Sequence, residues 1–200
     1  IDLPGEKRGM IPNDQYYDKA YNRSWNGLTI ISISIGQGEV TATPLQIANL
    51  GATIANRGYF ITPHVVKEVE GDSLDSLYTQ KRYTKVRREH YETVVQGMRQ
   101  AVLGGTCRGA DLPGIEVCGK TGTAQNRGKD HSAFMGFAPM KEPKIAVAVY
   151  VENGGWGATY GVPIGALIME KYLNGSLSAE SELKAQDIQK RRIDYGIHER

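Results

Sequence analysis

Three short segments in the second half of the chain place the strongest constraint on its fold. They run from Ile115 to Thr123, from Ser132 to Ala138 and from Lys144 to Glu152, and turn-forming Gly, Asn, Asp and Pro residues separate them. Each segment has the length and the β-favouring content of a strand. We therefore expect three consecutive strands that form an antiparallel meander.

Helical patterns lie before and after these strands. Thr43 can cap a helix that starts at Pro44 and stops before Gly58, and its broad apolar stripe predicts deep burial. Further helices are expected over about Arg87 to Leu103, ended by Gly104-Gly105, and over about Pro163 to Leu173. The fold class that fits is α+β, an antiparallel sheet covered by helices on its faces.

Two further segments have strand-like patterns. Ile30 to Ile35 alternates Ile with Ser in its later part and is expected to form a mostly buried strand that ends at Gly36-Gln37-Gly38. Tyr59 to Val69 is expected to be strand or extended chain, and Glu70 to Arg82 a polar connection. The charged stretch from Ser176 onward has no apolar stripe and predicts a solvated helix or a frayed tail.

Size and composition describe one globular domain or a large piece of one. The chain has 200 residues, 40% hydrophobic, with 24 Gly and 8 Pro. Its longest apolar run, Ile145 to Val151, is too short to cross a bilayer, and no signal peptide is recognisable. The abrupt opening at Ile1 suggests a cut edge. A net charge of +2 gives no reason to expect nucleic-acid binding.

The cysteines and histidines do not form a metal-binding pattern. Cys107 and Cys118 are never at ligand spacing with each other or with the four histidines, so we expect no zinc site, and no cofactor is indicated. In an oxidising compartment the two thiols could close a short loop, and in the cytosol they would be reduced and buried. The sequence leaves both states open.

Gly119 to Gln125, with the sequence G-K-T-G-T-A-Q, is the segment that packing explains least. On a strand, Lys120 and Gly122 share one face, while Thr121 and Thr123 share the other. Gly122 permits close approach by another backbone or a ligand. An ordinary edge strand with a solubilising Lys is the competing interpretation. K-T-G accompanies S-x-x-K and S-x-N in β-lactamases and penicillin-binding proteins, where context must support it.

The context does support it, because the chain from residue 1 to about 174 resembles class B penicillin-binding transpeptidases. The segments that carry the resemblance occur in the family's order: Ile1 to Glu6, Ile35 to Gly38, Thr43 to Gln46, Ala55 to Gly58, the K-T-G-T stretch, Asp130 to Pro139 and Val151 to Gly155. The last two are most similar to the elongation-type subfamily, penicillin-binding protein 2. Leu28 departs from the family pattern, where Asp is frequent.

The resemblance implies a penicillin-binding, β-lactamase-like fold and D,D-transpeptidation of peptidoglycan. In that reaction a serine attacks a D-Ala-D-Ala stem peptide and forms an acyl-enzyme, which the amine of a neighbouring strand resolves. If the residues that match the family motif have the same roles here, Lys120 supplies positive potential and the Thr121 and Thr123 hydroxyls bind the substrate carboxylate. The Thr123 N–H then completes the oxyanion hole. Gly122 lets the substrate, or a β-lactam that mimics it, lie alongside the strand.

The same resemblance implies a location and partners. The parent protein is expected on the periplasmic face of the inner membrane, anchored by an N-terminal helix, together with other cell-wall elongation proteins. Residues 1–175 would be the C-terminal part of the transpeptidase domain, and residues 176–200 a charged tail.

The nucleophilic serine of the family has no counterpart here. No S-x-x-K precedes Lys120, and the one match, Ser181 to Lys184, lies in the charged tail, where Ser fits a helix cap and Lys a surface charge. Ser24 to Asn26 matches S-x-N but lies in the segment that follows the family's own S-x-N. We therefore expect that this chain alone is inactive.

Two interpretations from other classes remain. A non-catalytic β-lactam sensor or scaffold module of the same fold is compatible with the K-T-G strand. A dinucleotide-binding domain would use Gly36 and Gly38 in the turn after a strand, but Thr41 stands where the third glycine is needed and no ribose-binding acid follows at the expected interval.

Overall fold

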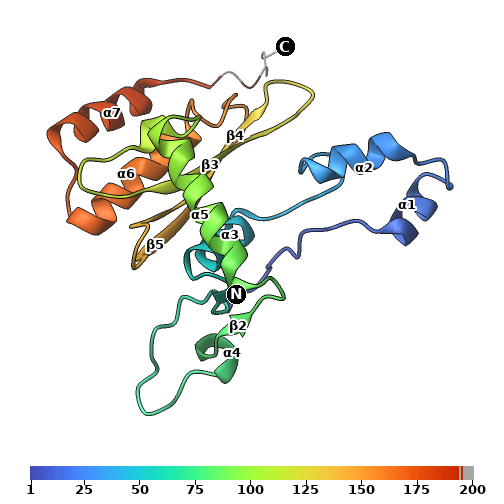
Figure 1. Cartoon of the computed structure of the whole chain (residues 1–200), viewed down its shortest axis with the longest axis horizontal. Helices are drawn as coiled ribbons and strands as arrows, with labels where there is room; N and C mark the ends of the chain where they lie inside the picture. The colour runs from blue at the N-terminus through green and yellow to red at the C-terminus, as the bar shows by residue number, and fades with distance from the viewer. Residues whose placement is uncertain (194, 196–200) are drawn as a thin grey trace. The chain divides into compact units, whose positions relative to one another are not determined.

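The computed structural model describes residues 1–193 and 195 (Figure 1). Contacts within the chain divide it into two compact units. The smaller unit is Pro4–Thr43, and the larger one combines Ile1–Leu3 with the chain from Pro44 onward. The candidate site lies entirely in the larger unit.

The smaller unit contains two short helices, α1 (Asp14–Ala20) and α2 (Gly27–Ser34). Tyr17 of α1 is buried, and its hydroxyl donates to Glu39 at 2.8 Å. The backbones of Met10 and Thr41 pair antiparallel near the ends of the unit, through hydrogen bonds of 2.8 and 2.9 Å. These contacts tie the unit together.

The expected strand at Ile30 to Ile35 is wrong, because this segment lies in and directly after α2. Asn26 caps the helix by accepting from the backbone N–H of Leu28, and the Thr29 side chain completes a capping box. Local capping therefore outweighs the β propensity of the isoleucines. Gly36, with a positive φ of 76°, follows the helix where a left-handed residue is favoured.

The expected meander is confirmed. Strands β3 (Cys118–Ala124), β4 (His131–Ala138) and β5 (Ile145–Val151) form one antiparallel sheet in the order β3-β4-β5. Lys120 lies opposite Met135, and Met135 lies opposite Ala148.

Helices cover both faces of this sheet, as expected for the α+β class. On one face α3 (Pro44–Ala55) packs on β4 and β5, with Gly51 against Met135, and α5 (Arg88–Leu103) contacts β3. On the other face α6 (Gly161–Asn174) places its glycines against Phe134, the neighbour of Met135 in β4. Successive residues of a strand point to opposite faces, so α3 and α6 lie on opposite sides of the sheet.

The chain between α3 and α5 contains only small elements. Strands β1 (Tyr59–Phe60) and β2 (Arg82–Tyr83) pair antiparallel, and α4 (Ser76–Thr79) is a single turn. A strand therefore forms at the start of the expected 59–69 segment only. A 3-10 turn, η1 (Arg108–Ala110), follows α5.

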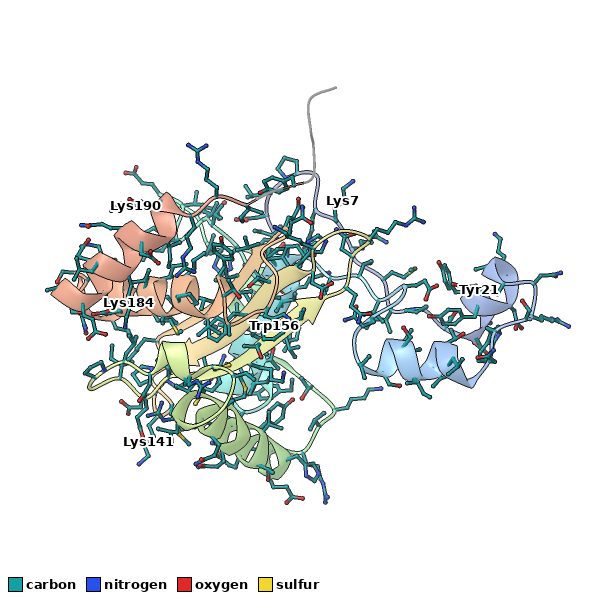
Figure 2. The ribbon with its side chains drawn as sticks, turned by 90° about the horizontal axis from the view of Figure 1, so that it is seen from above. Lys7, Tyr21, Lys141, Trp156, Lys184 and Lys190 are labelled. Carbon is teal, nitrogen blue, oxygen red and sulfur yellow. The ribbon has the colours of Figure 1, made fainter. Side chains whose placement is uncertain are left out.

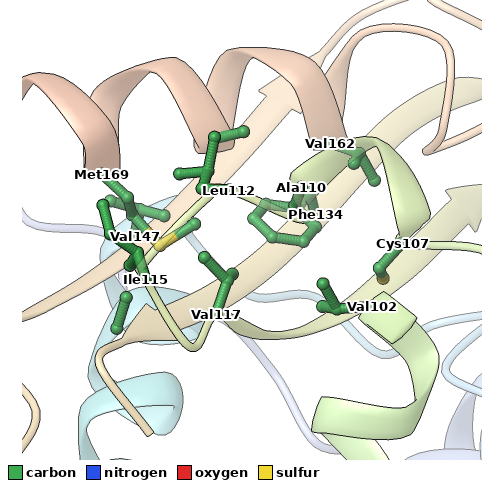
Figure 3. Packing of buried hydrophobic residues seen from close by; sticks show 12 residues of the cluster. Val102, Cys107, Ala110, Leu112, Ile115, Val117, Phe134, Val147, Val162 and Met169 are labelled. Carbon is green, nitrogen blue, oxygen red and sulfur yellow. The ribbon is translucent and has the colours of Figure 1, made fainter. Parts of the chain in front are cut away.

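The apolar core divides between the two faces of the sheet. Figure 3 shows the cluster on the α6 face, where Phe134 lies among residues from α5, η1, the segment before β3, β5 and α6. The second cluster lies on the α3 and α5 face and includes Val95, Met98, Cys118 and Phe137. This two-sided packing fixes β3 within the sheet.

After α6 the chain forms α7 (Ala179–Lys190), so the expected tail contains a helix, and this helix contacts α6. Lys184 and Lys190 lie on this helix in Figure 2, and its one buried residue is Ser181. Residues 194 and 196–200, the end of the expected tail, lie outside the described residues. Among those described, no helix has the length and apolar character of a membrane span.

Candidate functional site

All four expected site residues, Lys120 to Thr123, lie in β3. This strand is at the edge of the three-stranded sheet, paired with β4 on one side, and no other strand of the described residues pairs with its outer edge. An open edge can accept an extended peptide as an additional strand.

A pocket of about 210 Å³ opens on the sheet face that Lys120 and Gly122 share. It contains residues of all three strands and of α3; besides Lys120, Thr121 and Gly122 these are Pro44, Ile47, Leu50, Ala133, Phe134, Met135, Ala148, Val149 and Tyr150. The α3 and β5 residues are mainly apolar, while β3 contributes the ammonium. A ligand with an anionic group and an apolar part fits this distribution.

The polar groups of β3 have local partners. The exposed Lys120 ammonium donates to the Thr121 carbonyl at 2.8 Å. On the opposite strand face, Thr121 Oγ1 lies 2.8 Å from Oγ1 of Thr106. Thr106 belongs to the connection after α5, which the sequence marked only as a helix end through Gly104-Gly105. Sequence reasoning therefore missed Thr106, and it also missed the pocket residue Tyr150.

The connection between β5 and α6 packs behind β3. A Cβ on Gly157 would lie 2.7 Å from the Gly122 carbonyl oxygen and 3.0 Å from Thr121 Cβ, so only glycine fits there. The buried Ser132 hydroxyl donates to the Trp156 carbonyl at 2.8 Å and accepts from the Gly161 N–H at 3.0 Å. These contacts hold the connection against the strand, while the Trp156 side chain, labelled in Figure 2, is exposed.

The two cysteines are both buried free thiols. Cys107 lies in the core cluster on the α6 face, and Cys118 lies in the cluster on the α3 and α5 face. Burial raises the pKa of the Cys107 thiol and raises the pKa of the Cys118 thiol to about 11. Neither is poised as a nucleophile, because the thiolate is the reactive form.

The segments that imitate the serine motifs have structural roles. Asn26 caps α2, and the Ser24 hydroxyl donates to the Tyr21 carbonyl. Ser178, rather than Ser181, is the cap of α7, which corrects the expectation for that motif. Ser181 is buried, and Lys184 pairs with Glu180 on the helix surface at 2.8 Å.

The dinucleotide-binding alternative is contradicted by the secondary structure. A helix, not a strand, leads into Gly36 and Gly38, and the sheets of the described residues are antiparallel. Within residues 1–193 and 195, no group of three or more His, Cys, Asp or Glu side chains could hold a metal ion.

The K-T-G-T strand thus lies at an open edge of an antiparallel sheet that has helices on both faces. The chain belongs to the penicillin-binding protein transpeptidase domain family, whose model matches residues 1–172. Within this family the chain is most like penicillin-binding protein 2, as its similar relatives show.

Two curated relatives carry the description peptidoglycan D,D-transpeptidase MrdA. The Acinetobacter baumannii protein is 35% identical over 178 residues, which cover 80% of this chain and 26% of the relative. The Haemophilus influenzae protein is 34% identical over 201 residues, which cover 88% of this chain and 31% of the relative. The chain thus spans about a quarter to a third of the length of these relatives.

Solved structures of penicillin-binding protein 2 share the fold. The Pseudomonas aeruginosa protein, crystallised in complex with WCK 5153, matches with a TM-score of 0.74 and 36% identity over 90% of this chain and 40% of its own. The Helicobacter pylori protein in complex with MreC matches with a TM-score of 0.73 and 27% identity over 88% and 33%.

Proposed function

We propose that this chain supplies the substrate-binding strand of a peptidoglycan D,D-transpeptidase that works through a serine acyl-enzyme. The observation that carries the proposal is the K-T-G-T sequence on an open sheet edge beside a pocket that combines the Lys120 ammonium with apolar walls. A stem peptide ending in D-Ala-D-Ala offers an extended backbone and a terminal carboxylate, which match the edge and the ammonium.

Each residue of β3 has a role in this proposal. Lys120 supplies positive potential from one face of the strand, and the Thr121 and Thr123 hydroxyls donate to the terminal carboxylate from the other. The backbone N–H of Thr123 stabilises the oxyanion that forms when the serine attacks the peptide carbonyl. Gly122 leaves room for the substrate backbone, and a β-lactam binds in the same orientation.

The nucleophile comes from outside these 200 residues, since no S-x-x-K precedes Lys120. The share of the relatives that the chain covers supports a longer parent protein. The parent would act on the outer side of the cytoplasmic membrane, and the Helicobacter pylori complex with MreC supports partners in cell-wall elongation.

Intact-mass analysis after incubation with benzylpenicillin tests the proposal. The full-length parent should gain the mass of one penicilloyl group, while the 200-residue chain alone should gain none. Absence of the adduct in the folded parent would favour a scaffold role, and a stoichiometric adduct on this chain would show that its nucleophile lies within it.

A further inference from the structure

We propose that Thr106 is a positioning residue for Thr121: its hydroxyl donates to Thr121 Oγ1 and leaves the Thr121 proton for the carboxylate of the substrate. The inference rests on the proposed function, and it adds a residue from outside the K-T-G-T strand. The two Oγ1 atoms are 2.8 Å apart, a normal O–H···O hydrogen bond, and either can be the donor.

The direction of this hydrogen bond matters because a hydroxyl carries one proton. If Thr121 donates to Thr106, Thr121 can offer only lone pairs to an incoming carboxylate, and lone pairs repel an anion. If Thr106 donates, Thr121 accepts from Thr106 and donates to the carboxylate in a charge-assisted bond. Binding of an anionic ligand therefore selects Thr106 as the donor.

The backbone around Thr106 is held in place before any ligand binds. The N–H groups of its neighbours Gly105 and Cys107 both donate to the Ala101 carbonyl at the end of α5, at 3.1 and 2.9 Å. A Cβ on Gly105 would lie 2.9 Å from that carbonyl oxygen, so the turn requires glycine. The Thr106 hydroxyl thus projects from a fixed turn, which reduces the entropy lost on forming the contact.

Cys107, the next residue of the same turn, anchors it to the core. Its side chain is fully buried and belongs to the apolar cluster on the α6 face. The turn that presents the Thr106 hydroxyl is therefore fixed by its backbone hydrogen bonds and by a buried side chain.

The test uses the full-length protein with Thr106→Val, which keeps the shape but removes the hydroxyl, and Thr106→Ser, which keeps the hydroxyl. The second-order acylation rate constant is measured with benzylpenicillin and with its methyl ester, whose carboxylate is masked. We expect Thr106→Val to slow acylation by benzylpenicillin about tenfold, the effect of one lost hydrogen bond to a group that binds an anion. Thr106→Ser should react at nearly the wild-type rate, and the ester should respond little to either change.

A double-mutant cycle with Thr121→Val distinguishes a positioning role of Thr106 from a purely structural one, because it measures whether the two substitutions affect the acylation rate independently. If Thr106 acts through Thr121, Thr106→Val should cause no further loss in the Thr121→Val background. Equal slowing with both probes, additive losses in the cycle, or a Thr106→Ser variant as slow as Thr106→Val would overturn the inference. A wild-type protein that forms no penicilloyl adduct would instead refute the proposed function.

Discussion

Gly119, the residue directly before Lys120, leaves the space that the ring of Phe134 occupies: a Cβ at Gly119 would lie 2.6 Å from Cε2 of Phe134. Gly136, opposite Gly119 in β4, meets the same ring, as does Gly165 of α6. One buried aromatic ring therefore joins the substrate-binding strand to the core on the α6 face. The position of Lys120 depends on this packing.

Gly119→Ala should destabilise the protein by about 1–3 kcal/mol, because the methyl group must displace a ring that cannot move within a packed core. Gly97→Ala is the control, since a Cβ at this exposed position of α5 meets nothing within 4 Å. It should stabilise the protein by about 0.5–1 kcal/mol through helix propensity. Urea unfolding of the full-length variants measures both, and equal stabilities would contradict this account of Phe134.

Glu170 makes the docking of α7 dependent on pH. Burial raises the pKa of this carboxyl, but hydrogen bonds from Ser181 and Ser178 outweigh burial and hold the pKa below its usual value of 4.5. A lowered pKa in the folded state stabilises α7 above pH 4.5, and this stabilisation is lost as the pH falls through the lowered pKa. The protection factors of α7 amides, which compare measured with intrinsic exchange rates at each pH, should therefore fall at low pH.

Glu170→Gln is the matched variant for this prediction. Its amide keeps the shape and an acceptor oxygen but has no charge to lose, so its α7 exchange should be faster at neutral pH and should lack the acid step. An acid step that persists in the variant would assign the pH dependence to another group.

The C-terminal end of α7 is attached by Arg191. Its guanidinium donates to the Thr159 carbonyl at 3.0 Å, lies 5.6 Å from the Tyr160 ring centroid and pairs with Asp187 at 2.7 Å. Arg191→Ala should weaken this attachment by about 1 kcal/mol, since the contacts are partly exposed. Exchange should rise in α7 and in the connection before α6, whereas Arg192→Ala, whose side chain has no hydrogen bond or ion pair with the residues that the structure describes, should leave both unchanged.

The thiols should be protected in the folded protein. Burial raises the pKa of Cys118 to about 11 and also raises that of Cys107, so iodoacetamide at pH 8 should modify neither until the protein unfolds. Mass spectrometry under native and denaturing conditions counts the added groups. A mass two hydrogens lower, with no modification after unfolding, would reveal a disulfide and contradict the free thiols.

The sheet and its covering helices could be predicted because their patterns have one interpretation. Gly and Pro punctuate the strands from Ile115 to Glu152, and α5 repeats buried residues at helical spacing in Tyr91, Val95 and Met98. The strand prediction for Ile30 to Ile35 was wrong. Ile and Ser alternate there as in a strand, but the Asn26 capping box favours a helix. A side-chain cap depends on local hydrogen-bond geometry, which the alternation of residue types does not predict.

The site likewise contains residues that the sequence could predict and residues that it could not. Lys120 to Thr123 could be recognised because a cation, two hydroxyls and a glycine are an unusual combination for packing alone. Thr106 and Tyr150 could not, because their relation to β3 arises when distant segments meet in the fold. Gly104-Gly105 marked the end of α5 correctly, but only the structure shows that the turn presents a hydroxyl to Thr121.

The acylation rate of the full-length protein by benzylpenicillin, compared between wild type and Lys120→Ala, tests the central claim most directly. If Lys120 attracts the ligand carboxylate, its loss should slow acylation by about 10- to 100-fold, as expected for a hydrogen bond to a charged group. The melting temperature should stay unchanged, because the Lys120 side chain is exposed. An unchanged acylation rate, or a loss of stability large enough to account for the slower rate, would contradict the assignment of β3 as the substrate-binding strand.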